Sequence, residues 1–219
     1  MITFFKQLVQ TKHYKMIDSK THRLFGDWRN HKALKNTNTS LIDIYLIAYP
    51  NASKADILEL IEFSLYNQLL YEWHEIDEVL MSEWLNDYKN EYLHIIQEAF
   101  LKQHIEFGSS LDEAIDSLYN LSNYKQSYKE AWKYFRENFI DNERYCAWEV
   151  ECDTIPTLET FWDNPKCWSR YNVWVDITPK GTKYFNEILA PRFYNKYKDL
   201  EVEIDDKGNI VRWIGQINR

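Results

Sequence analysis

SKADILELIEFSLYNQLLYEW, residues 53–73, is the stretch that decides the fold. Its apolar side chains recur every four residues, the period of an amphipathic helix, at Ile57, Ile61, Leu65, Leu69 and Trp73. Ser53 and Asp56 have the spacing of a capping box, in which side chains satisfy the first free backbone amides of a helix. Because residues 51–107 contain neither Gly nor Pro, we predict a long helix here and a second one over residues 84–100.

More helices are predicted on both sides of this stretch. Ser110 with Glu113 predicts a capped helix that runs to Leu118, and an apolar period of four predicts another over residues 128–139. Upstream, short helices are expected over residues 4–9 and 40–49, the second closed by Pro50. Residues 13–39 have no assignable pattern.

After Asp141 the apolar period changes from four to two, which indicates strands. Strands are predicted over residues 146–152 and 171–177, and a hairpin over residues 200–214 turns at Asp205-Asp-Lys-Gly-Asn209. Between them, Thr178 is the expected N-cap of a helix that begins with Pro179 and ends at Pro191.

The fold class predicted from these patterns is α+β. An N-terminal and central helical bundle is followed by a small, mainly antiparallel sheet of about four strands with one packed helix. Residues 1–140 are the predicted helical region and residues 141–219 the α+β region, although the two could form one continuous domain.

Sequence and composition indicate where in the cell the protein is expected. The N-terminus lacks the continuous apolar segment of a secretion signal, and no stretch approaches the roughly 20 apolar residues of a membrane-spanning helix. We therefore expect a cytoplasmic protein without membrane partners. Three cysteines, an odd number, are expected to be free thiols. Cys146 and Cys152 would lie about 20 Å apart on their strand, too far for a disulfide.

Charge is distributed very unevenly along the chain, whose formal net charge is −8. Residues 1–55 hold nine Lys and Arg against three Asp and Glu, whereas residues 56–116 hold fifteen acidic residues against two basic ones. Such an excess of like charge weakens helices unless another surface offsets it. One alternative is internal: the basic N-terminal segment offsets part of the charge and solvent screens the rest.

The other alternative is a basic protein partner, attracted by the negative field and docked on acidic side chains of this region. The candidate partner-binding residues are Glu59, Glu62, Glu72, Glu75, Glu78, Glu83 and Asp87. Trp174 joins them because it alternates with Val173 and Val175 and would be an exposed interface residue on the other face of its strand.

Catalytic and metal-binding patterns are incomplete. Glu91 and His94 have the Glu-x-x-His spacing of di-iron bundles, but no second pair accompanies them. The cysteine spacings differ from those of zinc sites, and the glycine-rich loops that bind phosphate or build esterase sites are absent from the sequence. We expect no cofactor, no metal and no catalytic residues.

Residues 169–181, SRYNVWVDITPKG, resemble the wing strand and following turn of winged-helix regulators. The resemblance covers these thirteen residues only and implies DNA binding. A recognition helix should precede the wing, yet the preceding residues predict a strand, a short helix near Leu158–Trp162 and a loop. The acidic balance also disfavours nucleic acid as a partner.

The preferred hypothesis is thus a non-catalytic acidic binding protein, such as an inhibitor or immunity-type protein that neutralises a basic toxin nuclease. A winged-helix-like nucleic-acid-binding regulator is the alternative, which would need a basic face built from the N-terminal segment. An uncharacterised hydrolase is the second alternative, marked by a cleft that holds groups with perturbed pKa values. Nothing in the sequence sets the oligomeric state.

Overall fold

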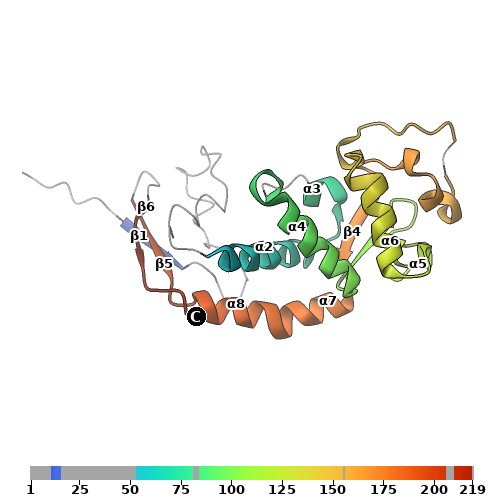
Figure 1. The fold of residues 1–219 in the computed structure, drawn as a ribbon. Coiled ribbons are helices and arrows are strands. Elements are labelled where there is room, and N and C mark those ends of the chain that lie inside the picture. The colour runs from blue at the N-terminus through green and yellow to red at the C-terminus, as the bar shows by residue number, and fades with distance from the viewer. Residues whose placement is uncertain (1–10, 16–52, 81–83, 155, 206–209, 219) are drawn as a thin grey trace, which may run out of the picture. The chain divides into compact units, whose positions relative to one another are not determined.

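A computed structural model describes residues 11–15, 53–80, 84–154, 156–205 and 210–218. The fold is α+β, as predicted, with helices and two small antiparallel sheets (Figure 1). The chain divides into two compact units. The division into residues 1–140 and 141–219 stays a prediction. We call residues 58–188 the core unit, and residues 1–57 with 189–219 the terminal unit.

The core unit consists of α-helices and short helical turns packed around one three-stranded sheet. The α-helices that lie wholly in it are α3 (Ile76–Leu80), α4 (Trp84–Leu101), α5 (Leu121–Tyr124), α6 (Tyr128–Phe135) and α7 (Pro179–Tyr184). Helix α2 (Lys54–Leu69) enters it from the terminal unit. A π-turn, η3 (Arg136–Ile140), extends α6, and 3-10 turns follow at η4 (Arg144–Cys146), η5 (Leu158–Asp163) and η6 (Pro165–Cys167).

The sheet of the core unit has the order β2 (His74–Glu75), β4 (Val173–Ile177), β3 (Ile105–Ser109), and both pairings are antiparallel. The sequence predicted β4 but neither of its neighbours. Gly108 lies opposite Trp174, and a Cβ at Gly108 would come within 2.0 Å of the indole ring. The absence of a side chain there leaves room for Trp174 to lie across β3.

Most predicted helices are confirmed. Ser53 and Asp56 cap α2 reciprocally: the Asp56 amide donates to Ser53 Oγ at 3.2 Å, and the Ser53 amide donates to the Asp56 carboxylate at 2.8 Å. Helices α4 and α6 follow the predicted apolar stripes, and Thr178 Oγ1 accepts from the Gly181 amide at the start of α7. Helix α2 ends at Leu69, so Trp73 lies beyond it and is exposed.

Two predicted elements are wrong. Residues 110–120 form turns rather than a capped helix, because Asp112, Ser117 and Asn120 bond to nearby backbone and hydroxyl groups. Such local bonds compete with helix formation. The predicted strand over residues 146–152 is also wrong: Cys146 ends the η4 turn, residues 147–152 have no regular structure, and Trp148 and Val150 are exposed.

An aromatic cluster fills the core unit between α6 and the 3-10 turns. Phe135 lies 4.9 Å from Phe139 and 6.0 Å from Trp168, measured between ring centroids. Trp168 is fully buried, packs 5.3 Å from Trp162, and donates its indole N–H to Phe161 O at 2.9 Å. Burying a large aromatic side chain contributes about 1.5–3 kcal/mol, so this cluster is a major source of stability.

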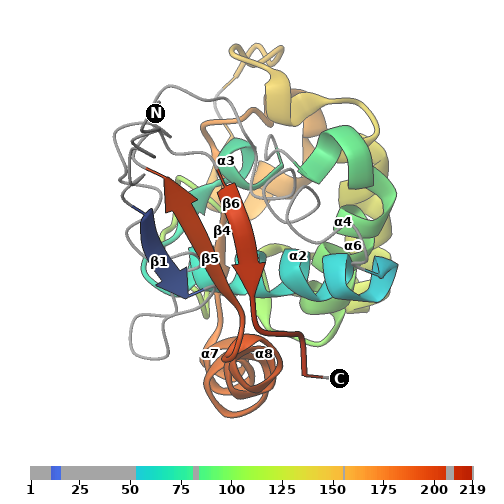
Figure 2. The same cartoon turned by 90° about the vertical axis from the view of Figure 1, so that its left-hand side faces the viewer.

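In the terminal unit, β5 (Glu201–Asp205) pairs with both β1 (Thr11–Lys15) and β6 (Ile210–Ile214), and the three strands lie side by side in Figure 2. The predicted hairpin is confirmed, whereas β1 was not predicted. Pro191 does not end a helix: η7 (Phe185–Leu189) leads directly into α8 (Ala190–Tyr197), and Pro191 lies in the first turn of α8. The predicted helices over residues 4–9 and 40–49 lie outside the described residues.

Candidate protein-interaction surface

A crowded group of carboxylates lies where α2 leads into β2 and α3. We call residues 72–78 the acidic turn. Glu72 and Glu78 are exposed and Glu75 is half-buried, whereas Asp77 is only 4% exposed. Burial raises the pKa of the Glu75 carboxyl, and repulsion from Asp77 and Glu78 raises it further. The turn thus concentrates negative charge at the surface of the core unit.

Arg170 offsets part of this charge, and His74 also contacts the group. Arg170 forms an ion pair with Asp77, and attraction to Arg170 works against the rise in the pKa of Glu75. His74 Nδ1 lies 2.6 Å from the Glu78 carboxylate, while its Nε2 lies 3.2 Å from Gln68 O. His74 therefore has a partner for each ring nitrogen and helps to position the acidic turn.

Two of the other predicted acidic residues, Glu59 and Glu62, lie on α2, before the acidic turn. Glu62 on α2 accepts a hydrogen bond from the Tyr184 hydroxyl at 2.9 Å, so it contributes to packing inside the core unit. Glu59 lies on α2 and is half-buried. Glu83 lies outside the described residues, and Asp87 lies in α4 with a side chain that is not described.

Trp174 is not the exposed interface residue that the sequence suggested. It is 3% exposed, and its indole N–H donates to Ser109 O at 2.9 Å and to Asp112 O at 3.0 Å. The turn after β3 covers this face of the sheet, which the strand pattern alone could not reveal. Trp174 therefore stabilises the core unit and is removed from the candidate surface.

Sequence reasoning missed an exposed aromatic group beside Arg170. The Arg170 guanidinium lies 4.3 Å from the ring centroid of Trp148 and 5.2 Å from that of Tyr171. Trp148 is 69% exposed and Tyr171 is 42% exposed. The adjacent Arg170-Tyr171 pair was the available signal, but the incorrect strand predicted over residues 146–152 gave no indication that Trp148 is exposed.

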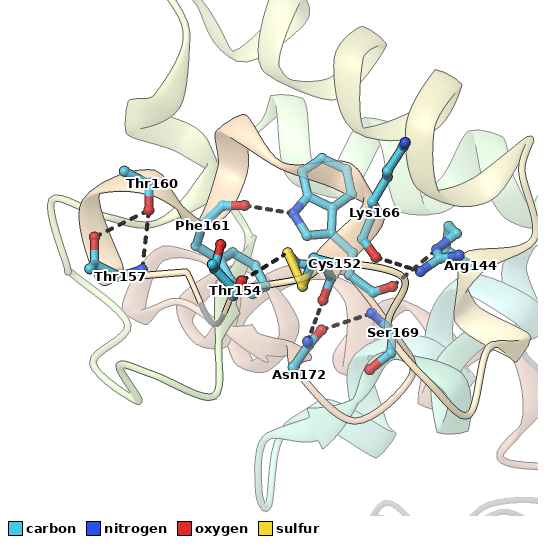
Figure 3. The surroundings of a disulfide bond; sticks show 11 residues. Arg144, Cys152, Thr154, Thr157, Thr160, Phe161, Lys166, Ser169 and Asn172 are labelled. Atoms are coloured by element: carbon cyan, nitrogen blue, oxygen red, sulfur yellow. Dashed lines mark hydrogen bonds between the residues drawn. A yellow bond between two sulfur atoms is a disulfide. The ribbon is translucent and has the colours of Figure 1, made fainter.

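The segment after Trp148 is fastened by a disulfide that the sequence did not predict (Figure 3). Cys152 is bonded to Cys167, whereas Cys146 is free and exposed. The prediction of three free thiols is thus wrong for two of them. Because the chain turns at η5 and η6 between Cys152 and Cys167, it brings the two cysteines to a Cα separation of 5.1 Å.

A buried polar cluster elsewhere in the core unit has groups suited to proton transfer. The Tyr66 hydroxyl lies 2.7 Å from His104 Nδ1, and the Tyr184 ring stacks on the His104 ring at 4.6 Å. Burial lowers the pKa of His104, helped by Lys180 and Lys102, and burial raises that of Tyr66. Since His104 is 7% exposed, a substrate has little access to it, and the cluster serves to pack α2 against α7.

The Glu91–His94 pair lies on α4, where His94 is exposed and the next acidic residue, Glu98, pairs with Lys102 at 3.3 Å. Across the described ranges, no three His, Cys, Asp or Glu side chains are grouped to hold a metal ion. Among the helices described in the structure, none has the length and apolar character to cross a membrane.

Comparison of the chain with protein families, curated proteins and solved structures found no match.

Proposed function

We propose that the protein is a non-catalytic acidic binding protein whose core unit engages a basic protein, as an inhibitor or immunity-type protein engages a cationic toxin nuclease. Charge supports this proposal. The core unit contains 25 acidic against 11 Lys and Arg residues, a formal charge of −14, whereas the terminal unit carries +6. A field of this sign speeds the approach of cationic proteins and repels nucleic acids.

The observation that carries the proposal is the crowding in the acidic turn. Burial is the largest cause of the raised pKa of Glu75, and repulsion of its carboxylate by Asp77 and Glu78 adds to it. A Lys or Arg side chain from a partner would relieve this repulsion, because an opposite charge within about 4–6 Å stabilises ionised carboxylates. Free energy lost to crowding in the free protein is then recovered on binding, which favours a basic partner at this position.

The experiment is affinity capture from the native source at low and at roughly physiological salt, followed by mass spectrometry. The test variant is Glu72→Gln with Glu75→Gln and Glu78→Gln. The matched control removes three charges from exposed positions elsewhere in the core unit, with Glu113→Gln, Glu137→Gln and Glu187→Gln. We expect wild type and control to retain a stoichiometric basic protein that the test variant loses.

Equal retention by the two triple variants would contradict a role for the acidic turn. Recovery of nucleic acid, or of no partner, would contradict the proposed function itself. Circular dichroism of each variant checks that the fold is kept, since the Glu75 side chain is half-buried.

The cytoplasmic location stays a prediction, and the Cys152–Cys167 disulfide weighs against it, because disulfides are rare in the cytosol of most organisms. The redox state of this pair in cells, trapped by acid and measured by thiol labelling, decides the compartment. A reduced pair agrees with the cytoplasmic prediction, and an oxidised pair contradicts it.

A further inference from the structure

The exposed rings beside Arg170 form a surface of unusual composition. We define the aromatic face as Trp148, Val150 and Tyr171 together with Arg170. Trp148, Val150 and Tyr171 are 69%, 44% and 42% exposed. Trp, Tyr and Arg are the residue types that most often dominate the binding energy of protein interfaces.

The rings are held in place although solvent surrounds them. Arg170 lies against both aromatic rings and is itself fixed by its ion pair with buried Asp77. The Trp148 and Tyr171 rings also meet edge to face, with centroids 5.7 Å apart. A side chain that is already ordered loses little conformational entropy when a partner covers it, so this arrangement favours tight binding.

The backbone that carries Trp148 is fastened on both sides of the ring. Before it, Ala147 O accepts from the Arg170 amide at 3.3 Å. After it, the Glu151 amide donates to Lys166 O at 2.9 Å, and the Arg144 guanidinium donates to the Glu151 carboxylate at 2.7 Å. Arg144 also bonds to Lys166 O, as Figure 3 shows, and the disulfide follows one residue after Glu151. A segment without regular structure thus presents Trp148 from a fixed position.

Exposed carboxylates lie close to Trp148 and Val150 in the chain and limit what can cover the aromatic face. Glu149 and Glu151 alternate with the apolar residues of the segment and are exposed, as is Glu143. Arg170 also connects the aromatic face to Asp77 and the acidic turn. A second copy of this acidic unit would be repelled, and so would a nucleic acid. The surface fits a cationic protein segment that carries a flat apolar side chain.

We infer that the aromatic face is the apolar anchor of the partner interface, which takes an aromatic side chain flanked by Lys and Arg from the basic partner. This inference rests on the proposed function and deepens it. The acidic turn supplies attraction over distance, and the aromatic face supplies a short-range contact that distinguishes the correct partner from other cationic proteins.

The test uses two fluorescein-labelled peptides of equal positive charge, one with a central Trp flanked by Lys and Arg and one with Ser in its place. Fluorescence anisotropy gives their affinities for the full chain, for Trp148→Ala and for the control Leu118→Ala, whose side chain is 81% exposed. We expect wild type to bind the Trp peptide about 10-fold more tightly than the Ser peptide. Trp148→Ala should remove that preference, and Leu118→Ala should keep it.

Failure of this inference can be distinguished from failure of the proposed function. Suppose that both peptides bind wild type equally and that only the Glu72, Glu75 and Glu78 triple variant binds them more weakly. The role of the acidic turn is then supported, and the role of the aromatic face as an anchor is overturned. If neither peptide binds, the proposed function is contradicted as well. If sedimentation shows a wild-type dimer that Trp148→Ala dissociates, the face joins two copies of this chain, and the inference is overturned.

Discussion

Two carboxylates are buried at opposite edges of the sheet in the core unit, and they differ in the groups that contact them. Beside β2, Asp77 is paired with the guanidinium of Arg170. On β3, Glu106 accepts from the Phe107 amide at 3.0 Å and the Ser122 amide at 3.3 Å. Burial raises the pKa of Glu106 to about 7 despite these bonds, and Asp116 adds repulsion. Asp77 is therefore stabilised by a counter-charge, whereas the charge of Glu106 changes with pH near neutrality.

The Asp77 edge should be the most sensitive to mutation. Asp77→Ala leaves the Arg170 side chain, only 17% exposed, without its counter-charge. Removing one partner of a buried ion pair costs about 3–5 kcal/mol, so urea denaturation should show a loss of that size. The control Asp141→Ala removes an exposed pair with Arg136 and should cost about 1 kcal/mol or less. Equal losses would mean that the Asp77–Arg170 pair is not effectively buried.

The disulfide should matter next, because it fastens the segment that leads to Arg170. The Cys152–Cys167 bond closes a loop with a sequence separation of 15, for which chain entropy predicts about 3 kcal/mol of stabilisation. Cys152→Ser with Cys167→Ser, or reduction of the wild type, should lower the free energy of unfolding by that amount. Cys146→Ser is the matched control and should leave it nearly unchanged. A reductant that has no effect on wild type would contradict this contribution.

Glu106 should make the stability of the protein depend on pH. Its pKa in the folded protein is about 7, above the usual value of 4.5, so the folded state binds more protons than the unfolded state between these values. Stability contributed by this carboxyl is therefore greatest at low pH and falls as pH rises from about 4.5 to 7. Glu106→Gln keeps an oxygen acceptor but does not titrate, so its stability relative to wild type should be about 3 kcal/mol more favourable at pH 8 than at pH 4. An identical pH profile in both proteins would contradict the assignment.

The smallest effect on stability should come from Trp148→Ala, since the ring is mostly exposed and contributes mainly its contact with Arg170. A loss of about 1 kcal/mol or less is expected in urea denaturation. Trp168→Ala, which removes a fully buried ring, should cost about 3–5 kcal/mol. A loss of similar size at Trp148 would show that the ring supports the fold rather than a binding surface.

The two edges of the sheet also show which features the sequence alone could predict. The acidic excess and the candidate residues Glu72, Glu75 and Glu78 were visible in the sequence, because charge is a property of composition. The partial burial of Glu75 and its attraction to Arg170 were not, since the two residues are 95 positions apart. The sequence predicts no strand at Glu106, and only its pairing opposite Asp176 places it in β3.

Local signals determined the long elements. The four-residue period and capping box set α2, the apolar stripe set α4, and alternation set β4 and the β5–β6 hairpin, because each signal acts within a few residues. Tertiary structure decided the rest. Strand β3 exists because β4 pairs with it, Trp174 is buried because the turn after β3 covers it, and Cys152 meets Cys167 because the chain folds back between them. Such contacts join residues distant in sequence, and their free energy is gained only when the core unit packs.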